Sequence, residues 1–317
     1  MGHFVFVVIV IYIFASSSQL IEGSCTWPAA FANQVWEDSA HGTLTFTSSE
    51  ISAGGLVVDY TVYGTVDTWI CQDDSQYVSN NILLIRSKSS FLGLASTPFY
   101  VYFCLKLTTL TSSSFIYYLQ NEPEIQTANK NRVKTSNIDT STASDVCDSA
   151  NAATGQEFIT LVNQASASTA YTQCPSVLLG HFEFNYTAAG GTETCNDPTQ
   201  NTPNGHERMD VCTDKTKLDF PYPCATSIVN AAAEVHCVAS VTSGSDTFVA
   251  LYNPQASVDG STTFRFSCLA ISSNSLQATV VNNSCTSAMT SSNLAVDASN
   301  TQIGGSIVFY PYAYDVI

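Results

Sequence analysis

Short runs in which apolar and polar positions alternate recur along most of the chain. Within residues 43–47, Leu44 and Phe46 fall on one face of an extended strand, and the β-branched and aromatic run 56–63 ends at Gly64. Similar runs occupy residues 99–107, 115–119, 181–186, 247–252, 263–271, 276–281 and 306–310. Runs of this length, bounded by Gly, Pro, Asn and Ser, are typical of antiparallel β-sheets. Only residues 157–164 and 227–235 show the periodicity of short helices.

The first residues have the pattern of a secretory leader. An unbroken apolar run covers 4–15 and is followed by the small residues Ala15 to Ser18. A membrane-spanning helix needs roughly 20 apolar residues, so the run is too short, although an uncleaved anchor is the alternative. We therefore predict a signal peptide over 1–23, cleaved after Ser17, Ser18 or Gly23. Because no second run of spanning length follows, we expect a secreted, extracellular chain with no membrane span after cleavage.

Segments of different composition divide the remaining chain. Residues 121–144 contain no aromatic residue and are rich in Asn, Thr, Ser and Lys, which predicts a solvated linker. We place a first Cys-rich β module at 24–120, the linker at 121–146, a second module at 147–232 and a third at 233–317. The expected fold is all-β, with two or three disulfide-braced antiparallel modules, sandwich-like or small and barrel-like, and little helix.

Three phrases occur twice and support related modules. The first is a Cys with a nearby Pro and then an aromatic strand, after Cys25 and after Cys174. The second is Cys-x-Asp-x-Ser/Thr-x-apolar, starting at Cys71 and at Cys212, and the third is an aromatic run that ends in Cys-Leu at Cys104 and at Cys268. Chance in a Cys- and aromatic-rich chain is the competing explanation, but three echoes with matched polarity favour duplication.

The eleven cysteines indicate an oxidising compartment and a disulfide framework. We expect ten of them in disulfides: Cys25, Cys71, Cys104, Cys147, Cys174, Cys195, Cys212, Cys224, Cys237 and Cys268. The favoured pairs are Cys237 with Cys268 and Cys195 with Cys212, and the other connectivities stay open. Cys285 lies outside the repeated phrases and is the candidate unpaired thiol. It would then either link two copies into a covalent homodimer or stay buried and free.

The spacing of these motifs carries a family resemblance. The order is Cys25-Thr-Trp-Pro, Trp36, Ile-Cys71 and Tyr-Phe-Cys104-Leu, then Cys174-Pro with Gly180-His-Phe-Glu-Phe-Asn-Tyr186, Cys195, Cys212-x-Asp and Pro-Tyr-Pro-Cys224. It resembles an uncharacterised invertebrate family of secreted proteins and ectodomains built from tandem cysteine-rich domains of unknown function. The resemblance covers most of residues 25–271 and implies no known activity. The chain has Gln34 where the family usually has Gly, and lacks the C-terminal membrane segment of many members.

Charge and motif content exclude several function classes. The net charge of −16 argues against nucleic acid and anionic membranes as partners, since both require clustered Lys and Arg. His41, His181, His206 and His236 are isolated, and neither a Gly-x-Ser-x-Gly nor a Cys-x2-Cys motif occurs. We therefore expect no enzyme activity, no catalytic residues, no metal and no cofactor.

The remaining signals concern glycans and partners. Asn185-Tyr-Thr and Asn282-Asn-Ser are sequons, so Asn185 and Asn282 are predicted glycosylation sites. The expected function is that of an extracellular interaction or matrix protein whose β modules bind a protein or a glycan. The alternative is a lipocalin-like carrier of a small apolar ligand, because a Gly-x-aromatic start such as Gly180-His-Phe182 also opens lipocalin barrels.

Overall fold

The structure is a computed structural model of the 317-residue chain. It describes residues 25–52, 54–93, 96–191, 194–195, 207–220, 234–260 and 263–311, although not the side chains of Thr194, Cys195 and Glu207. The predicted signal peptide at 1–23 and Cys224 therefore lie outside the described residues. No helix in the described ranges is long and apolar enough to span a membrane.

The first sheet is an antiparallel, nearly closed barrel. Along the sheet its strands are β2 (Gly42–Thr45), β1 (Val35–Asp38), β12 (Ile159–Asn163), β10 (Ser114–Leu119), β9 (Pro98–Thr111), β7 (Ile82–Ser87), β6 (Trp69–Asp73) and β3 (Glu50–Ile51). A bridge between Phe46 and Ile51 brings the two ends of this order together. The long strand β9 extends past the barrel, where it also pairs with β8 (Phe91–Leu92) and β11 (Lys134–Ser136). A separate hairpin is formed by β4 (Val58–Tyr60) and β5 (Gly64–Val66).

The second sheet is a closed antiparallel ring. Its order is β14 (Thr194–Cys195), β13 (His181–Ala188), β15 (Glu207–Asp210), β16 (Lys217–Asp219), β17 (Glu234–Ser243), β18 (Asp246–Tyr252), β19 (Phe266–Ser272), β20 (Gln277–Asn282) and β23 (Gly305–Pro311). Pairing of β13 with β23 closes the ring. A small hairpin of β21 (Ala295–Val296) and β22 (Gln302–Ile303) lies outside it.

Helices are short. The α-helices of the described part are α1 (Tyr77–Asn80) and α2 (Ala143–Val146), and the 3-10 helices are η2 (Ser149–Asn151), η3 (Gln164–Thr169), η4 (Ser176–Leu178) and η5 (Ala189–Gly191). The all-β, barrel-like fold with little helix is therefore confirmed. The helix expected at 157–164 is wrong, because this segment contains β12, which is buried throughout and pairs with β1 and β10. Pairing on both edges outweighs a weak local periodicity.

The sheets do not follow the expected module boundaries. Strand β12 lies in the range assigned to the second module but belongs to the first sheet. The ranges 147–232 and 233–317 share the second sheet instead of each forming a sheet of its own. The expected linker 121–146 contains β11 and α2 and packs on the first sheet, so it is not a free connection between modules.

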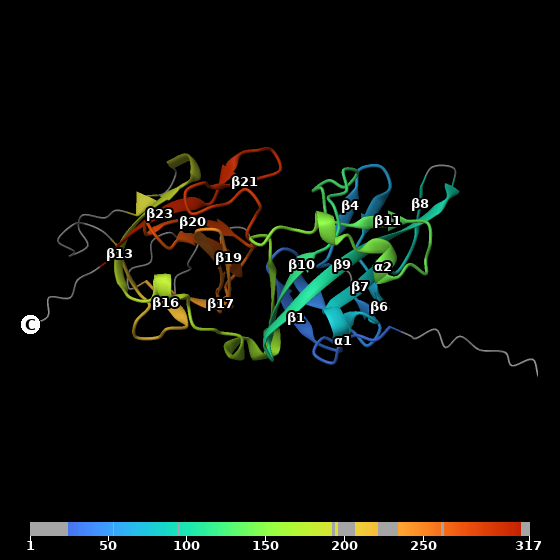
Figure 1. The fold of residues 1–317 in the computed structure, drawn as a ribbon, viewed down its shortest axis with the longest axis horizontal. Helices are drawn as coiled ribbons and strands as arrows, with labels where there is room; N and C mark the ends of the chain where they lie inside the picture. Colours follow the sequence, from blue (N-terminus) through green and yellow to red (C-terminus); the bar gives the residue numbers. More distant parts are fainter. Residues whose placement is uncertain are drawn as a thin grey trace, which may run out of the picture.

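Each sheet has its own core, and a third cluster lies between the two. Inward-facing residues of the first sheet include Trp36, Trp69 and Phe103, and those of the second include Phe184 and Tyr186. The outer face of β17 to β20 packs against Ile116 and Val162 of the first sheet and against Phe158. The two barrels lie side by side, with β4, β8 and β11 gathered at one end of the first (upper right in Figure 1).

The disulfides differ from the pairs favoured by the sequence. The structure pairs Cys25 with Cys71, Cys104 with Cys147, Cys174 with Cys237, and Cys268 with Cys285. The Cys237–Cys268 expectation is therefore wrong. These residues lie on β17 and β19, which are separated by β18.

The unpaired thiol also differs. Cys285 is buried and bonded to Cys268, whereas Cys212 is an exposed free cysteine. This overturns the expected Cys195–Cys212 pair and the covalent dimer through Cys285. Cys212 follows the end of β15 and its amide N–H donates to the carboxylate of Asp210, so its surroundings are a surface turn.

Candidate functional site

The interior of the first barrel is too small to hold a ligand. The cavity among Trp27, Phe31, Leu44 and their neighbours has a volume of about 20 Å³. This is space for roughly one water molecule, whereas ligand pockets measure about 300–1,000 Å³. Aromatic side chains fill the interior, and the carrier hypothesis gains no support from this barrel.

A polar hollow of about 360 Å³ lies where the two sheets meet, with Glu37, Asp38, Arg265 and Asn283 in its lining. The Tyr252 hydroxyl donates to Glu37 Oε2 at 2.5 Å, and Arg265 Nε lies 3.2 Å from Glu37 Oε1. Arg265 also donates to the backbone oxygen of Asn253 at 2.6 Å. These contacts satisfy the buried charge of Glu37 with groups of the other sheet. The hollow therefore contains a polar contact between the two sheets, in which Glu37, Tyr252 and Arg265 already have partners.

The histidine closest to this hollow has a structural role. Asp38 is 2 % exposed and accepts the amide N–H groups of Ala40 and His41 and the hydroxyl of Tyr117, at 2.7, 2.9 and 2.6 Å. The His41 ring lies 3.2 Å from the same carboxylate. These bonds fix the turn between β1 and β2. No group of three or more His, Cys, Asp and Glu in the described part of the chain is arranged to hold a metal ion.

The second hollow lies at the end of the first sheet where β4, β8 and β11 gather. We call it the aromatic pocket, and it is lined by Tyr60, Tyr63, Phe91, Gly93, Phe99, Glu124, Gln126 and Thr135. Its volume is about 280 Å³. This is close to the lower limit for small-molecule sites, so it suits one side chain or a small ligand.

The rings of the aromatic pocket form a continuous apolar wall. Phe91 stacks on Tyr63 with 5.4 Å between ring centroids and on Phe99 with 6.0 Å, and Tyr60 lies tilted against it at 5.0 Å. These residues come from β4, the turn after it, β8 and β9. A Cβ atom at Gly93 would lie 2.5 Å from the Phe99 ring, so only glycine lets this ring fold over the β8–β9 loop.

Three exposed apolar residues adjoin residues of the aromatic pocket along the chain. The described part of the chain exposes five large hydrophobic side chains, and three of them are chain neighbours of pocket residues: Val62 next to Tyr63, Leu92 next to Phe91, and Ile125 between Glu124 and Gln126. They are 80 %, 64 % and 82 % exposed. Single exposed apolar residues need no explanation, whereas contiguous exposed apolar patches mark interaction sites. We call Val62, Leu92 and Ile125 the apolar rim.

Among the described residues that line the aromatic pocket, Glu124 alone is charged. Its Oε1 accepts the backbone N–H of Gln126 at 3.1 Å, and its backbone oxygen accepts the Thr127 hydroxyl at 2.8 Å. All ten Lys and Arg side chains of the protein belong to described residues, and none forms an ion pair with Glu124 there. Its carboxylate is therefore available for a ligand.

Tyr60 is affected by this carboxylate. Burial raises the pKa of its phenol to about 12, the hydrogen bond to Thr135 counteracts the rise, and the charge of Glu124 adds to it. The hydroxyl lies 2.7 Å from Thr135 Oγ1. Tyr60 is therefore a neutral, fixed wall of the aromatic pocket at physiological pH.

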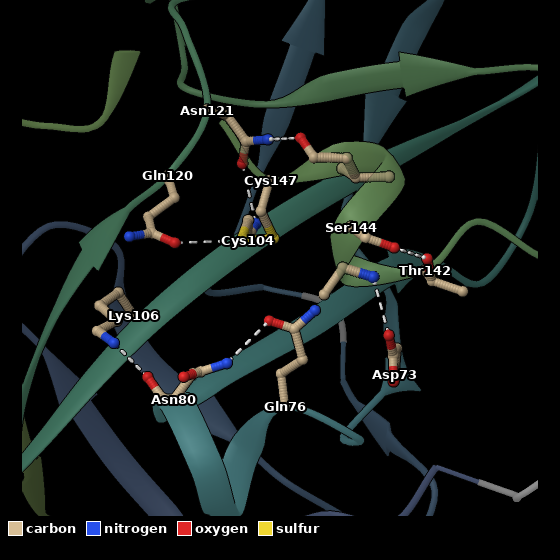
Figure 2. The surroundings of a disulfide bond; sticks show 12 residues. Asp73, Gln76, Asn80, Cys104, Lys106, Gln120, Asn121, Thr142, Ser144 and Cys147 are labelled. Atoms are coloured by element: carbon tan, nitrogen blue, oxygen red, sulfur yellow. Dashed lines mark hydrogen bonds between the residues drawn. A yellow bond between two sulfur atoms is a disulfide. The ribbon is translucent and has the colours of Figure 1, made fainter. Parts of the chain in front are cut away.

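The segment that supplies Glu124, Gln126 and Thr135 is fixed at both ends. Figure 2 shows the Cys104–Cys147 disulfide, which ties the end of this segment to β9. At the other end the Asn121 side chain accepts the backbone N–H of Cys104 at 2.9 Å and donates to the backbone oxygen of Val146 at 3.1 Å. The side-chain amide of Asn121 thus connects the start of the segment both to its end and to β9.

Helix α2 is also held to the sheet. Asp73 of β6 accepts the backbone N–H of Ala143 at 2.8 Å (Figure 2). Burial alone would raise the pKa of Asp73, but the hydrogen bonds from Ser75 and Ala143 outweigh it and lower the pKa. In the middle of the segment, Thr61 N–H donates to the backbone oxygen of Gln126 at 3.2 Å, which joins it to the turn after β4.

The hydrophobic pattern of the sequence does not predict this pocket. Its polar residues come from the expected linker, where the absence of aromatic residues suggested a solvated loop. The apolar Ile125 between the polar residues Glu124 and Gln126 is a local sequence signal at this place. The predicted glycan acceptors lie elsewhere. Asn282 is at the end of β20 and half-buried, while Asn185 is half-buried on β13 with its Oδ1 buried, so both stay predictions.

Comparison with known proteins gives a domain but no activity. Residues 171–300 match the model of a domain of unknown function, DUF7042. The match starts before β13 and ends before β23, so it runs along the second sheet through both the range expected for the second module and the range expected for the third. No curated protein and no solved structure matches the chain. A DUF7042 domain is therefore present at residues 171–300, and the first sheet, which contains the aromatic pocket, lies outside the matched range.

Proposed function

We propose that the protein is an extracellular binding protein that docks on a protein partner through the aromatic pocket and the apolar rim. One observation carries the proposal. Three of the five large hydrophobic side chains exposed in the described residues are chain neighbours of residues that line a pocket whose rings form an apolar wall. Interaction surfaces of this kind combine an apolar, aromatic centre with a polar edge.

The disulfide framework supports an extracellular location. Disulfides persist in oxidising compartments, and four link cysteines of the described residues. The secretory leader predicted from the apolar run at 4–15 agrees with this location. A fixed frame also favours binding, because a pocket that is ordered before binding loses less conformational entropy when the partner arrives.

A protein partner fits the surface better than a glycan. Rings can stack on sugars, but Val62, Leu92 and Ile125 cannot donate to or accept from hydroxyl groups. Burying them against a protein removes apolar area from water, at roughly 25 cal/mol per Å².

The test compares two sets of substitutions in fluorescently labelled protein that binds to native cell surfaces or matrix. The set V62S, L92S and I125S removes the apolar rim. The matched control is V78S and I138S, which changes exposed apolar residues outside the pocket lining. We expect the first set to weaken binding by about tenfold or more, since hot-spot losses exceed roughly 1.4 kcal/mol, and the control set to leave it unchanged.

Treatment of the surfaces identifies the partner class. Protease treatment should abolish binding and glycosidase treatment should leave it intact. Equal losses from both sets of substitutions would overturn the proposed surface. Loss on glycosidase treatment alone would show that the partner is a glycan.

A further inference from the structure

We infer that the aromatic pocket receives a cationic side chain, Lys or Arg, flanked by apolar residues of the partner. The inference rests on the proposed function and specifies the chemistry that the pocket recognises. It combines two features of the lining: the aromatic rings of two tyrosines and two phenylalanines, and one carboxylate with no ion pair in the described residues.

The rings suit a cation with a long apolar stem. A guanidinium or ammonium group over the face of an aromatic ring is attracted to its π electrons, and the methylene stem packs against the rest of the wall. The molecule already uses this contact elsewhere. Arg86 lies 4.2 Å from the ring centre of Tyr100, and Arg265 lies 5.5 Å from that of Tyr252.

Glu124 supplies the charge for such a ligand. Its Oε1 accepts the Gln126 N–H, and its Oε2 has no hydrogen bond among the described residues. The charge acts within the pocket, because it contributes to the raised pKa of Tyr60 across the lining. A cation in this space would approach the carboxylate and the ring faces together, and the two attractions would act in the same direction.

The charge of the whole molecule favours the same ligand. With 26 acidic and 10 basic residues the net charge is −16, so the field attracts basic partners and repels acidic ones. The carboxylate of Glu124 would additionally repel an anionic ligand. The apolar rim selects for apolar residues on either side of the cation, because Val62, Leu92 and Ile125 stand next to the pocket residues.

The test uses three peptides and one sugar with the full chain. The peptides are acetyl-Leu-Arg-Leu-amide, the same peptide with citrulline, and the same peptide with Glu, and the sugar is cellotetraose. Citrulline has the shape of arginine without its charge. Ligand-observed saturation-transfer NMR and calorimetry should show binding of the Arg peptide, weaker binding of the citrulline peptide, and none of the Glu peptide. Binding of the Arg peptide should fall with added salt.

Two matched variants isolate the carboxylate. E124Q should weaken binding of the Arg peptide roughly threefold to tenfold, a typical loss for a partly exposed charge and ring contact. E122Q removes an exposed carboxylate two residues earlier, outside the pocket lining, and should leave binding unchanged. F91L keeps an apolar side chain but removes the central ring, and should weaken the Arg peptide more than the citrulline peptide.

Other results would overturn the inference. These are equal binding of the Arg and citrulline peptides, an equal effect of E122Q and E124Q, or binding of cellotetraose in place of the peptides. If no probe binds while the rim substitutions still abolish docking, the cationic ligand is refuted and the proposed function stands. If the rim substitutions have no effect, the proposed function itself fails.

Discussion

The two barrels carry their disulfides at corresponding places, but these disulfides close loops of different length. In each barrel, a cysteine that precedes the strands bonds to a cysteine on one strand, β6 or β17. A second disulfide joins a cysteine on the strand two positions farther along the sheet, β9 or β19, to a cysteine that follows the next strand, β10 or β20. The first barrel has Cys25–Cys71 and Cys104–Cys147, and the second has Cys174–Cys237 and Cys268–Cys285. Strands β6, β7 and β9 of the first thus correspond to β17, β18 and β19 of the second.

The difference lies in the loops that the second bond of each barrel closes. Cys104 and Cys147 are 43 residues apart, whereas Cys268 and Cys285 are 17 apart. The longer loop holds Glu124, Gln126 and Thr135, which complete the aromatic pocket. A repeated frame thus fixes the strands, and an enlarged loop on one copy supplies the candidate site. This is how binding residues are commonly placed, on loops held by a rigid scaffold.

The largest expected effect concerns these two disulfides. Loop-closure entropy gives a stabilisation of about 4 kcal/mol for a separation of 43 residues and about 3 kcal/mol for one of 17. C104A with C147A should therefore lower the free energy of unfolding more than C268A with C285A, as measured by denaturant titration.

Binding of the Arg peptide should distinguish the two disulfide variants further. Only C104A with C147A should weaken the Arg peptide, because only this variant releases the segment that carries Glu124. If both variants bind the peptide as well as the parent protein, the disulfide does not support the pocket.

The next effect tests whether the two barrels unfold together. Tyr252 on β18 donates to the buried Glu37 on β1, so Y252F removes a bond between the sheets and leaves part of a buried carboxylate without a donor. We expect a loss of about 1–3 kcal/mol in the free energy of unfolding. The control is Y118F, where a half-buried hydroxyl bonds to the backbone oxygen of Gly155.

Denaturant titration followed by near-ultraviolet circular dichroism measures this coupling. A single transition in the parent protein that splits in Y252F would show that the network couples the barrels. Equal losses in Y118F and Y252F would argue against it.

A smaller effect distinguishes the second barrel by pH. His236 on β17 stacks on Tyr171 with ring centroids 3.7 Å apart. Burial lowers its pKa, although the charges of Glu234 and Asp214 counteract this. Because the pKa of His236 is lower in the folded state, the unfolded chain takes up the proton at a higher pH than the folded chain. The stability that neutral His236 contributes is therefore lost as the pH falls from about 6.5 through the pKa of the folded state.

Denaturant titrations between about pH 7 and pH 5 measure this loss. H236F keeps an aromatic ring for the stack and should flatten the pH dependence. A parent protein whose stability does not change over this range would refute the assignment.

The smallest effect is local to the aromatic pocket. The pKa of Tyr60 is raised to about 12, in part by the charge of Glu124. E124Q should lower it by a fraction of a unit, as seen in an ultraviolet titration of the phenolate with Y60F as the reference. An unchanged pKa would mean that the carboxylate does not face the ring.

The sequence predicted some elements well for a clear physical reason. The alternation at 181–186 places Phe182, Phe184 and Tyr186 in the core, and these residues are buried in β13. The phrases around Cys104 and Cys268 lie on corresponding strands, β9 and β19. The echo of Cys71 with Cys212 does not hold in the structure, since Cys237 takes the place that corresponds to Cys71.

By itself, the sequence determined the all-β class, the approximate strand positions and the presence of a disulfide framework. Each of these follows from local chemistry: alternation with a period of two, β-branched and aromatic residues, and the number of cysteines. Only the tertiary structure decided which cysteines pair, that 121–146 folds onto the first barrel, and that Glu124 meets Tyr60, Tyr63, Phe91 and Phe99. These depend on contacts between residues far apart in the chain, which no local pattern records.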